Sequence, residues 1–150
     1  MMPSKRIKSL LITAVVCCFV SLQANAESDP QSVVDQYISA LKSYQFEKAY
    51  KQVSKDMQQE MDQAQWSAVH KEMFTGAEVT ILSYQTSPAV YKEAKAIVPN
   101  WIVATDKILN KDGAKEFELY TLIKEGGEWR IDNQELLFGA EEIEPWFPKN

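Results

Sequence analysis

His70 is the side chain of this sequence best suited to acid–base chemistry near neutral pH, and it is the only histidine. It lies beside Val69 and Met73 on the apolar side of a predicted helix. In one interpretation it is a general base inside the domain, oriented by a carboxylate such as Asp132. We favour the other, a partly buried histidine with one hydrogen bond, because no second histidine, cysteine or local carboxylate motif accompanies it.

Motifs for metal, phosphate and nucleophilic chemistry do not occur in the sequence. There is no G-x-S-x-G, no H-E-x-x-H and no glycine-rich phosphate loop. One histidine does not make a zinc site, so we expect no metal and no cofactor. Asp106, Asn110 and Asp112 have an oxygen-rich spacing, but a calcium loop needs more ligands. We interpret them as a polar hairpin loop.

Two aromatic residues near the C-terminus, Trp146 and Phe147, are candidates for an interaction. They lie between Pro145 and Pro148 in an acidic, aperiodic tail, residues 139–150. No helix or strand face explains them. Either they fold back and plug the open end of the sheet, which we favour, or they dock to a partner.

The N-terminus has the three-part pattern of a secretory signal peptide. A basic start is followed by an apolar run over residues 10–22 and by Ala24-Asn25-Ala26, a small-x-small cleavage site. The run is too short for a spanning helix, which needs roughly 20 residues. We therefore expect cleavage after Ala26 and one exported domain over residues 27–150, located in the periplasm or outside the cell. Cleavage also removes both cysteines, Cys17 and Cys18.

The charge of the mature chain limits its partners. The signal peptide contains three of the 16 basic residues and none of the 21 acidic ones, which leaves 13 against 21, or a net charge of −8. Nucleic acid requires clustered Lys and Arg, and an anionic membrane surface would repel the chain, so we expect neither as a partner. An unidentified protein or a small apolar ligand is expected instead.

The elements that must position these side chains begin with helices. Asp29 followed by Pro30 predicts a helix start, with Asp29 as the N-cap. An apolar stripe at helical spacing follows, made of Val33, Val34, Tyr37, Ile38 and Leu41.

Three more helical segments are predicted after the first. One covers residues 46–53, a short one is capped by Ser54 or Asp56, and one covers residues 66–74. Gly76 is expected to stop the last of them.

The hydrophobic period then changes from that of a helix to that of a strand. Strands are predicted at residues 79–86, 94–106, 115–124 and 129–135, the last two joined by a glycine-rich turn. Pro99 lies inside the second strand, where we expect a bulge or an edge because proline cannot donate to a ladder.

Alternation assigns faces to these strands. It places Glu116, Glu118, Tyr120 and Leu122 together, and likewise Trp129, Ile131 and Asn133. A homodimer through the outer sheet face is a further expectation, with Val98, Ile102 and Leu122 as the apolar residues that would drive it.

Helices followed by antiparallel strands predict an α+β fold. We expect the N-terminal helices to pack on a strongly curved antiparallel sheet, which would form a cone with a pocket between helix and sheet.

Two segments resemble the nuclear transport factor 2-like, cystatin-like superfamily, especially its small exported bacterial domains of unknown function. Residues 29–50 contain Asp29-Pro30, and residues 120–132 contain Gly126-Gly127-Glu128-Trp129-Arg130-Ile131. The resemblance covers nearly all of residues 27–150 and implies a helical hairpin in a bent sheet, with Trp129 and Ile131 as core anchors. The superfamily contains enzymes, ligand binders and protein-interaction modules, so it does not determine function. No catalytic constellation of its enzymes matches this sequence.

The favoured function is that of an exported, non-enzymatic accessory domain that binds a small ligand or a protein. One alternative is a small cone-type enzyme that uses His70 for proton transfer on an apolar substrate. The other is an inhibitor or immunity-type protein whose acidic surface docks a basic target. A pocket with converging polar groups would favour the enzyme and a mostly apolar pocket the binder. A filled cone with an exposed apolar patch would favour the inhibitor.

Overall fold

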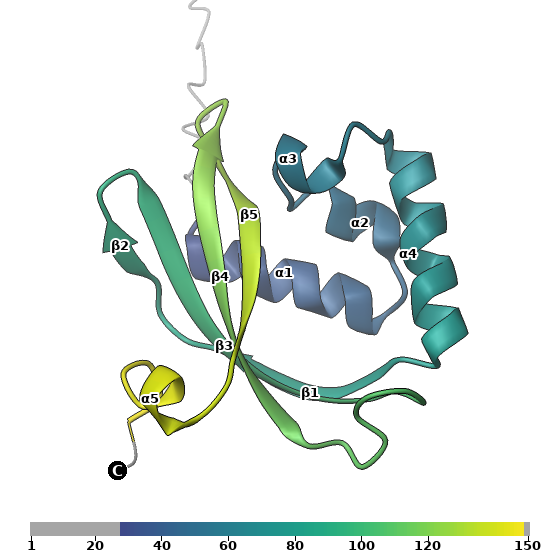
Figure 1. Cartoon of the computed structure of the whole chain (residues 1–150). Helices are drawn as coiled ribbons and strands as arrows, with labels where there is room; N and C mark the ends of the chain where they lie inside the picture. The colour runs from purple at the N-terminus through teal and green to yellow at the C-terminus, as the bar shows by residue number, and fades with distance from the viewer. Residues whose placement is uncertain (1–27, 149–150) are drawn as a thin grey trace, which may run out of the picture.

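The computed structural model describes residues 28–148. The predicted signal peptide, residues 1–26, lies outside the described residues. Helices precede strands along the chain, as predicted, and the fold is α+β (Figure 1). The elements are α1 Pro30–Lys42, α2 Phe46–Tyr50, α3 Lys55–Gln58, α4 Gln63–Ala77, β1 Thr80–Thr86, β2 Val90–Lys92, β3 Lys95–Thr105, β4 Lys115–Glu125, β5 Glu128–Leu137 and α5 Ala140–Ile143.

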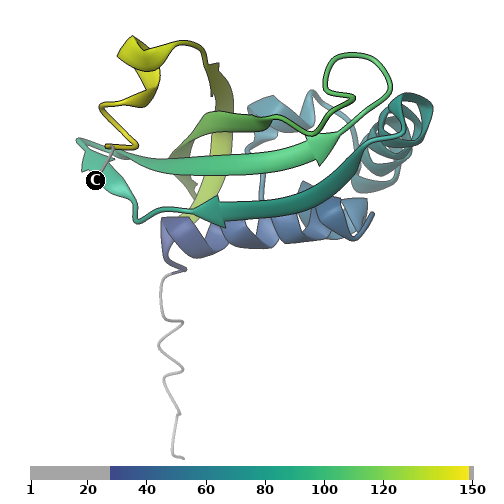
Figure 2. The ribbon, with the colours of Figure 1, turned by 90° about the horizontal axis from the view of Figure 1, so that it is seen from below.

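The strands form one antiparallel sheet in the order β1-β3-β4-β5, with the short β2 also paired to β3. The sheet is strongly curved, and α1 lies along its concave side (Figures 1 and 2). Helix α2 packs between α1 and α4. Helix α4 lies across from β4 and β5 and forms a second wall (Figure 1). The predicted cone-like packing of helices on a curved antiparallel sheet is therefore confirmed. No helix within residues 28–148 is long and apolar enough to cross a membrane.

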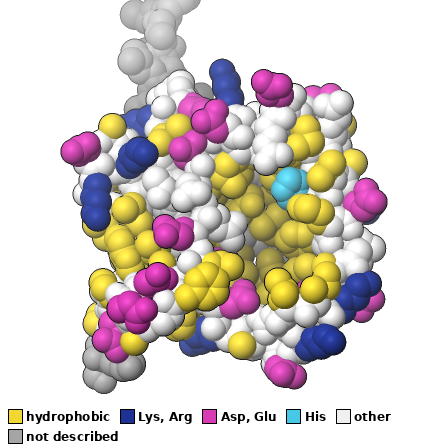
Figure 3. Space-filling view, viewed as in Figure 1, with side chains coloured by type: hydrophobic (Ala, Val, Ile, Leu, Met, Phe, Trp, Pro, Cys, Tyr) yellow, Lys and Arg dark blue, Asp and Glu magenta, His cyan; other side chains and the backbone are white. Residues whose placement is uncertain are grey.

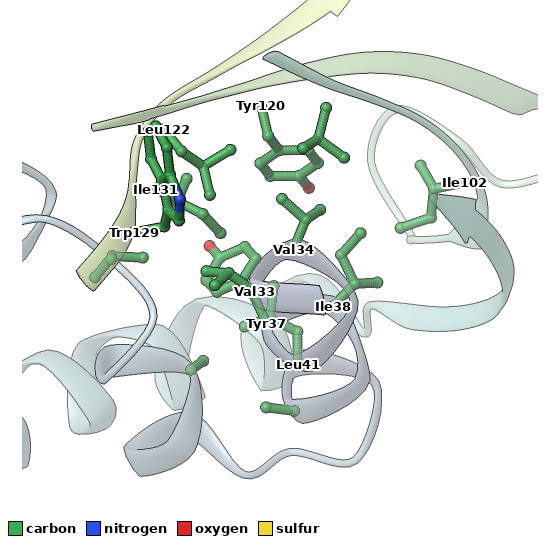
Figure 4. Close-up of a cluster of buried hydrophobic side chains, with 14 of the residues drawn as sticks. Val33, Val34, Tyr37, Ile38, Leu41, Ile102, Tyr120, Leu122, Trp129 and Ile131 are labelled. Atoms are coloured by element: carbon green, nitrogen blue, oxygen red, sulfur yellow. The ribbon is translucent and has the colours of Figure 1, made fainter. Parts of the chain in front are cut away.

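Helix α1 begins where its cap residues predict. Oδ2 of Asp29 accepts a hydrogen bond from the backbone N of Ser32 at 3.3 Å, and Pro30 occupies the first turn. The predicted stripe is buried, and its side chains face Tyr120, Leu122 and Ile131 of the sheet (Figure 4). Burial of each such side chain contributes about 1.5–3 kcal/mol, so this stripe anchors the helix to the sheet.

Helix α4 continues past the glycine that was predicted to stop it. A capping box between Asp62 and Gln65 starts it, but Gly76 lies within the helix, which ends at Ala77. The left-handed position falls on Glu78, with a φ of 54°, and the N–H of Val79 closes the last turn on the carbonyl of Phe74. The position that needs a positive φ is thus two residues after the glycine.

Pro99 lies in an interior strand and not at a bulge. It is opposite Leu119 in a continuous register between β3 and β4. Its carbonyl accepts from the N–H of Ser87, in the gap between β1 and β2. Because the N and the C=O of a strand residue point to the same side, the proline nitrogen also faces this gap, where no ladder donor is required.

A bulge in β5 overturns the predicted facing of Asn133. Thr121 is opposite Asn133 and Leu122 is opposite Ile131, so Asp132 is an extra residue on β5. Ile131 faces the core, whereas Asn133 shares the side of Thr121. The bulge therefore places Gln134, and not Asn133, on the concave face.

The apolar residues assigned to an outer dimer face are also placed differently. Val98, Ile102 and Leu122 are buried in the core on the concave face. They are therefore not available to a partner on the convex side.

The C-terminal tail folds back onto that convex side, and none of its described residues lines the opening on the concave side, where a plug was predicted. It contains a short helix, α5, which the aperiodic sequence did not predict and which lies across the sheet from α1 (Figure 2). The Phe147 ring is 4.9 Å from the ring of Phe117 between centroids, and Nζ of Lys92 is 5.5 Å from the centre of the Trp146 ring. Both tail aromatics are half-buried.

Candidate functional site

The concave side of the sheet contains an open cavity of about 280 Å³. Helices α1 and α4 form one wall, and β1, β3, β4 and β5 form the other. A hollow with mainly hydrophobic walls is visible in Figure 3, with the histidine at its rim. Its lining residues are Tyr37, Ile38, Leu41, His70, Met73, Phe74, Val79, Ile81, Ile102, Ala104, Glu116, Glu118, Tyr120 and Gln134.

Glu118 is the polar centre of this cavity. Its side chain is only 4% exposed. Nδ2 of Asn100 donates to Oε2 at 2.8 Å, and the hydroxyl of Tyr120 donates to the same oxygen at 3.1 Å. Nε2 of Gln134 donates to Oε1 at 2.8 Å. Three uncharged donors therefore hold one buried carboxylate.

The sheet register brings this cluster together. Asn100 and Glu118 are directly opposite on β3 and β4, and Tyr120 follows two residues later on the same face. Gln134 is opposite Tyr120 on β5 and reaches the same face only because of the bulge at Asp132. The alternation of β4 predicts that Glu118 shares a face with Tyr120 and Leu122. A glutamate on the apolar face of a strand is the sequence feature that indicates this site.

Burial and the charge of the carboxylate shift the pKa values of the cluster. Desolvation raises the pKa of Glu118, against the opposing effect of the hydrogen bonds from Asn100, Gln134 and Tyr120. Burial, and then the charge of Glu118, raise the pKa values of Tyr37 and Tyr120. No Lys or Arg among the described residues lines the cavity.

His70 lies on the α4 wall of the same cavity, half-buried. Its ring stacks on Trp66 at 3.5 Å between centroids, and Nδ1 is 2.8 Å from the carbonyl oxygen of Trp66. A carbonyl only accepts, so Nδ1 carries a proton and the neutral ring has its lone pair on Nε2. Desolvation lowers the pKa of His70, with the hydrogen bond to Trp66 acting in the opposite direction.

The carboxylates that line the cavity with His70 are those of Glu116 and Glu118, and not that of Asp132, the predicted partner. Asp132 occupies the β5 bulge and is not among the lining residues. Within residues 28–148 no hydrogen bond joins His70 to Glu118 or to Asp132. The cavity thus brings His70 and Glu118 together without pairing them.

The remaining candidates lie away from the cavity. Trp146 and Phe147 contact the convex face of the sheet. Asp106 accepts from the backbone N–H groups of Ile108, Leu109 and Asn110, so its carboxylate organises the loop. The part of the chain that the structure describes contains no group of three or more His, Cys, Asp or Glu side chains able to hold a metal ion.

Comparison with known proteins relates the chain to others by fold alone. No family model and no curated protein sequence matches it. A SEC-C motif containing protein from Rhodopseudomonas palustris superposes with a TM-score of 0.58 at 12% identity, over 73% of this chain and 80% of that protein. A domain of unknown function with a cystatin-like fold from Nostoc punctiforme has a TM-score of 0.53 at 14% identity, over 74% and 76%.

A second cystatin-like protein of unknown function from Nostoc punctiforme superposes with a TM-score of 0.51 at 9% identity, over 72% of this chain and 86% of that protein. The chain is an α+β domain with a cystatin-like fold, its helices packed against an open, curved antiparallel sheet. The predicted resemblance is confirmed as a cystatin-like fold.

Proposed function

We propose that this protein is an exported domain that binds a small, mostly apolar molecule in the cavity on the concave side of its sheet. The observation that carries the proposal is an open cavity with apolar walls and one polar cluster at Glu118. Ligand sites generally have this form, in which apolar walls supply affinity and a few polar groups fix orientation. The signal-peptide pattern of residues 1–26 supports the export part.

The size of the cavity sets the size of the ligand. An apolar cavity of about 150 Å³ accommodates benzene. The present cavity has about 280 Å³ and is open on one side. A molecule with one or two rings, or an aliphatic body of similar volume, would therefore fit.

The hydrogen bonds of Glu118 favour binding over catalysis. A carboxylate offers about four acceptor positions. Three of them are already used by Asn100, Tyr120 and Gln134. A carboxylate fixed by three donors is held in one orientation, and its remaining acceptor position can orient a ligand.

Methyl NMR tests the binding proposal. Indole, cyclohexanol and benzylamine are titrated into the mature protein, and shifts are followed on the methyl groups of Ile38, Ile81 and Ile102. Replacement of Ala104 by Phe fills the cavity and should abolish the shifts, whereas Val103→Phe, on the opposite face of β3, should not. Absence of shifts with all three probes at millimolar concentration would overturn the proposal.

The export part has a separate test. Intact-mass analysis of the exported material should find a chain that starts at Glu27. A species that starts at Met1, or one with a lipid on Cys17 or Cys18, would contradict this part alone.

Proton transfer is the second candidate function, because His70 and Glu118 line one cavity and Nε2 of His70 carries the free lone pair. An enzyme of this kind would lose its biological activity in a His70→Gln variant that folds normally. A docking role for Trp146 and Phe147 is less favoured, because both rings already contact the domain.

A further inference from the structure

We propose that the ligand is a primary amine on a small apolar body, and that its ammonium group binds Oε1 of Glu118. The inference deepens the binding function proposed above and depends on it. Its basis is the charge and the hydrogen-bond capacity of the cavity.

The first argument is charge. Glu118 is buried, and its donors Asn100, Tyr120 and Gln134 are all uncharged. The ion pairs Lys107–Glu78 and Arg130–Glu128 lie elsewhere in the described chain. A buried carboxylate is costly unless a counter-charge compensates it. The described lining residues provide no positive charge for Glu118, so a cationic ligand would supply the missing counter-charge.

The second argument is the number of open acceptors. Oε2 of Glu118 accepts from both Asn100 and Tyr120, whereas Oε1 accepts only from Gln134. Oε1 therefore keeps one acceptor position. Oδ1 of Asn100 is also buried without a hydrogen-bond partner within residues 28–148. The cluster therefore has acceptors without donors, and an ammonium group would supply three N–H donors.

The third argument is the surroundings of the carboxylate. Tyr37 and Tyr120 lie edge to face, 6.0 Å apart between centroids, and both line the cavity beside Glu118. Aromatic rings near a cation add attraction. The rest of the wall is apolar, from Ile38 and Leu41 on α1 to Ile81 and Ile102 on the sheet. An anionic ligand would meet Glu118 and Glu116 without a lysine or arginine among the described lining residues.

A matched series on one apolar body tests the inference. Benzylamine, benzyl alcohol, benzyltrimethylammonium and benzoate have the same ring but differ in charge and in donors. We expect benzylamine to bind the wild-type protein about tenfold more tightly than benzyl alcohol, the usual gain of a charged over a neutral hydrogen bond. The trimethylammonium compound keeps the charge but has no N–H, so it should lose most of this gain, and benzoate should bind most weakly.

The variants locate the effect. Glu118→Gln keeps the shape of the side chain and removes its charge, and should reduce the preference for the amine to about twofold or less. Glu135→Gln is the matched control, since it removes an exposed carboxylate from β5 and should leave the preference unchanged. If Glu118→Gln does not fold, the wild-type series alone is decisive.

The outcomes separate this inference from the function on which it rests. Equal affinity for the amine and the alcohol, or tighter binding of benzoate, would overturn the amine assignment and leave the binding function standing. Binding of none of the four compounds, nor of indole and cyclohexanol, would overturn both.

Discussion

Asn100 and Glu118 face each other across β3 and β4, and the amide of one donates to the carboxylate of the other at 2.8 Å. Both side chains are buried, at 0% and 4% exposure, on a face that is otherwise mainly apolar. A polar pair in such a place costs stability unless its groups are satisfied. Asn100 therefore supports Glu118, which lines the cavity.

Replacement of Asn100 by Ala should destabilise the domain. The variant loses one of three donors to a buried carboxylate, which is worth about 1.5–3 kcal/mol. The pKa of Glu118 should rise further, because that hydrogen bond lowers it. Urea unfolding measures the first effect and carboxyl-carbon NMR titration the second. Asn133→Ala, on the exposed side of β5, should change the stability by less than about 0.5 kcal/mol.

The raised pKa of Glu118 predicts a pH dependence of stability. In the unfolded chain the group titrates near its ordinary value of about 4.3. Burial raises its pKa in the folded state. Between the ordinary and the raised pKa, the folded state therefore binds more protons than the unfolded state. The contribution of Glu118 to stability is therefore fully present below its ordinary pKa and is lost as the pH rises through the raised value.

Comparison with Glu118→Gln isolates this effect. The free energy of unfolding of the wild type minus that of the variant should fall as the pH is raised from about 4 to 8. A difference that is flat or that rises with pH would show that the carboxylate is not desolvated. Glu135→Gln, measured in parallel, accounts for the general effect of removing one charge.

Local sequence predicted the elements well because local chemistry determines them. Asp29 and Pro30 start α1, Ser54 caps α3, and the buried stripe of α1 has helical spacing. The resulting α+β cone followed from the order of these elements. The prediction that Gly76 ends α4 was wrong, because a helix ends at the residue that adopts the left-handed conformation. Here that residue is Glu78.

The cavity was only partly predictable, because it depends on pairings between strands. His70 was identified from its type, and Glu118 had the correct face but no assigned role. Gln134 could not be found, since a bulge at Asp132 shifts the alternation by one residue and no local signal marks it. Strand alternation alone cannot detect such a shift.

Replacement of Trp129 by Ala should cost about 3–5 kcal/mol, the range for a buried large aromatic side chain. Trp129 is 7% exposed and belongs to the core beside Ile131. Its neighbour Tyr91 is 61% exposed, and Tyr91→Ala is the matched control, expected to cost less than about 1 kcal/mol. A denaturation midpoint of Trp129→Ala equal to that of the wild type would contradict the burial of this ring.

Truncation after Gly139 should lower stability and expose apolar surface. The shortened chain loses Phe147 from its contact with Phe117 and Trp146 from its contact with Lys92. Two half-buried aromatic rings account for roughly 2–3 kcal/mol. Thermal unfolding and binding of a fluorescent apolar probe measure the two effects. Unchanged stability together with loss of a captured partner would instead identify the tail as an interaction site.

Replacement of His70 by Gln should leave the function intact. The glutamine amide can still donate a hydrogen bond toward the carbonyl of Trp66, although the ring stacking on Trp66 is lost. A binding site that acts through Glu118 requires no proton transfer at His70. A deletion strain complemented by wild type or by the variant, at matched protein levels, is the test. If the variant is present at the wild-type level and complementation is lost, proton transfer by His70 becomes the better account of the cavity.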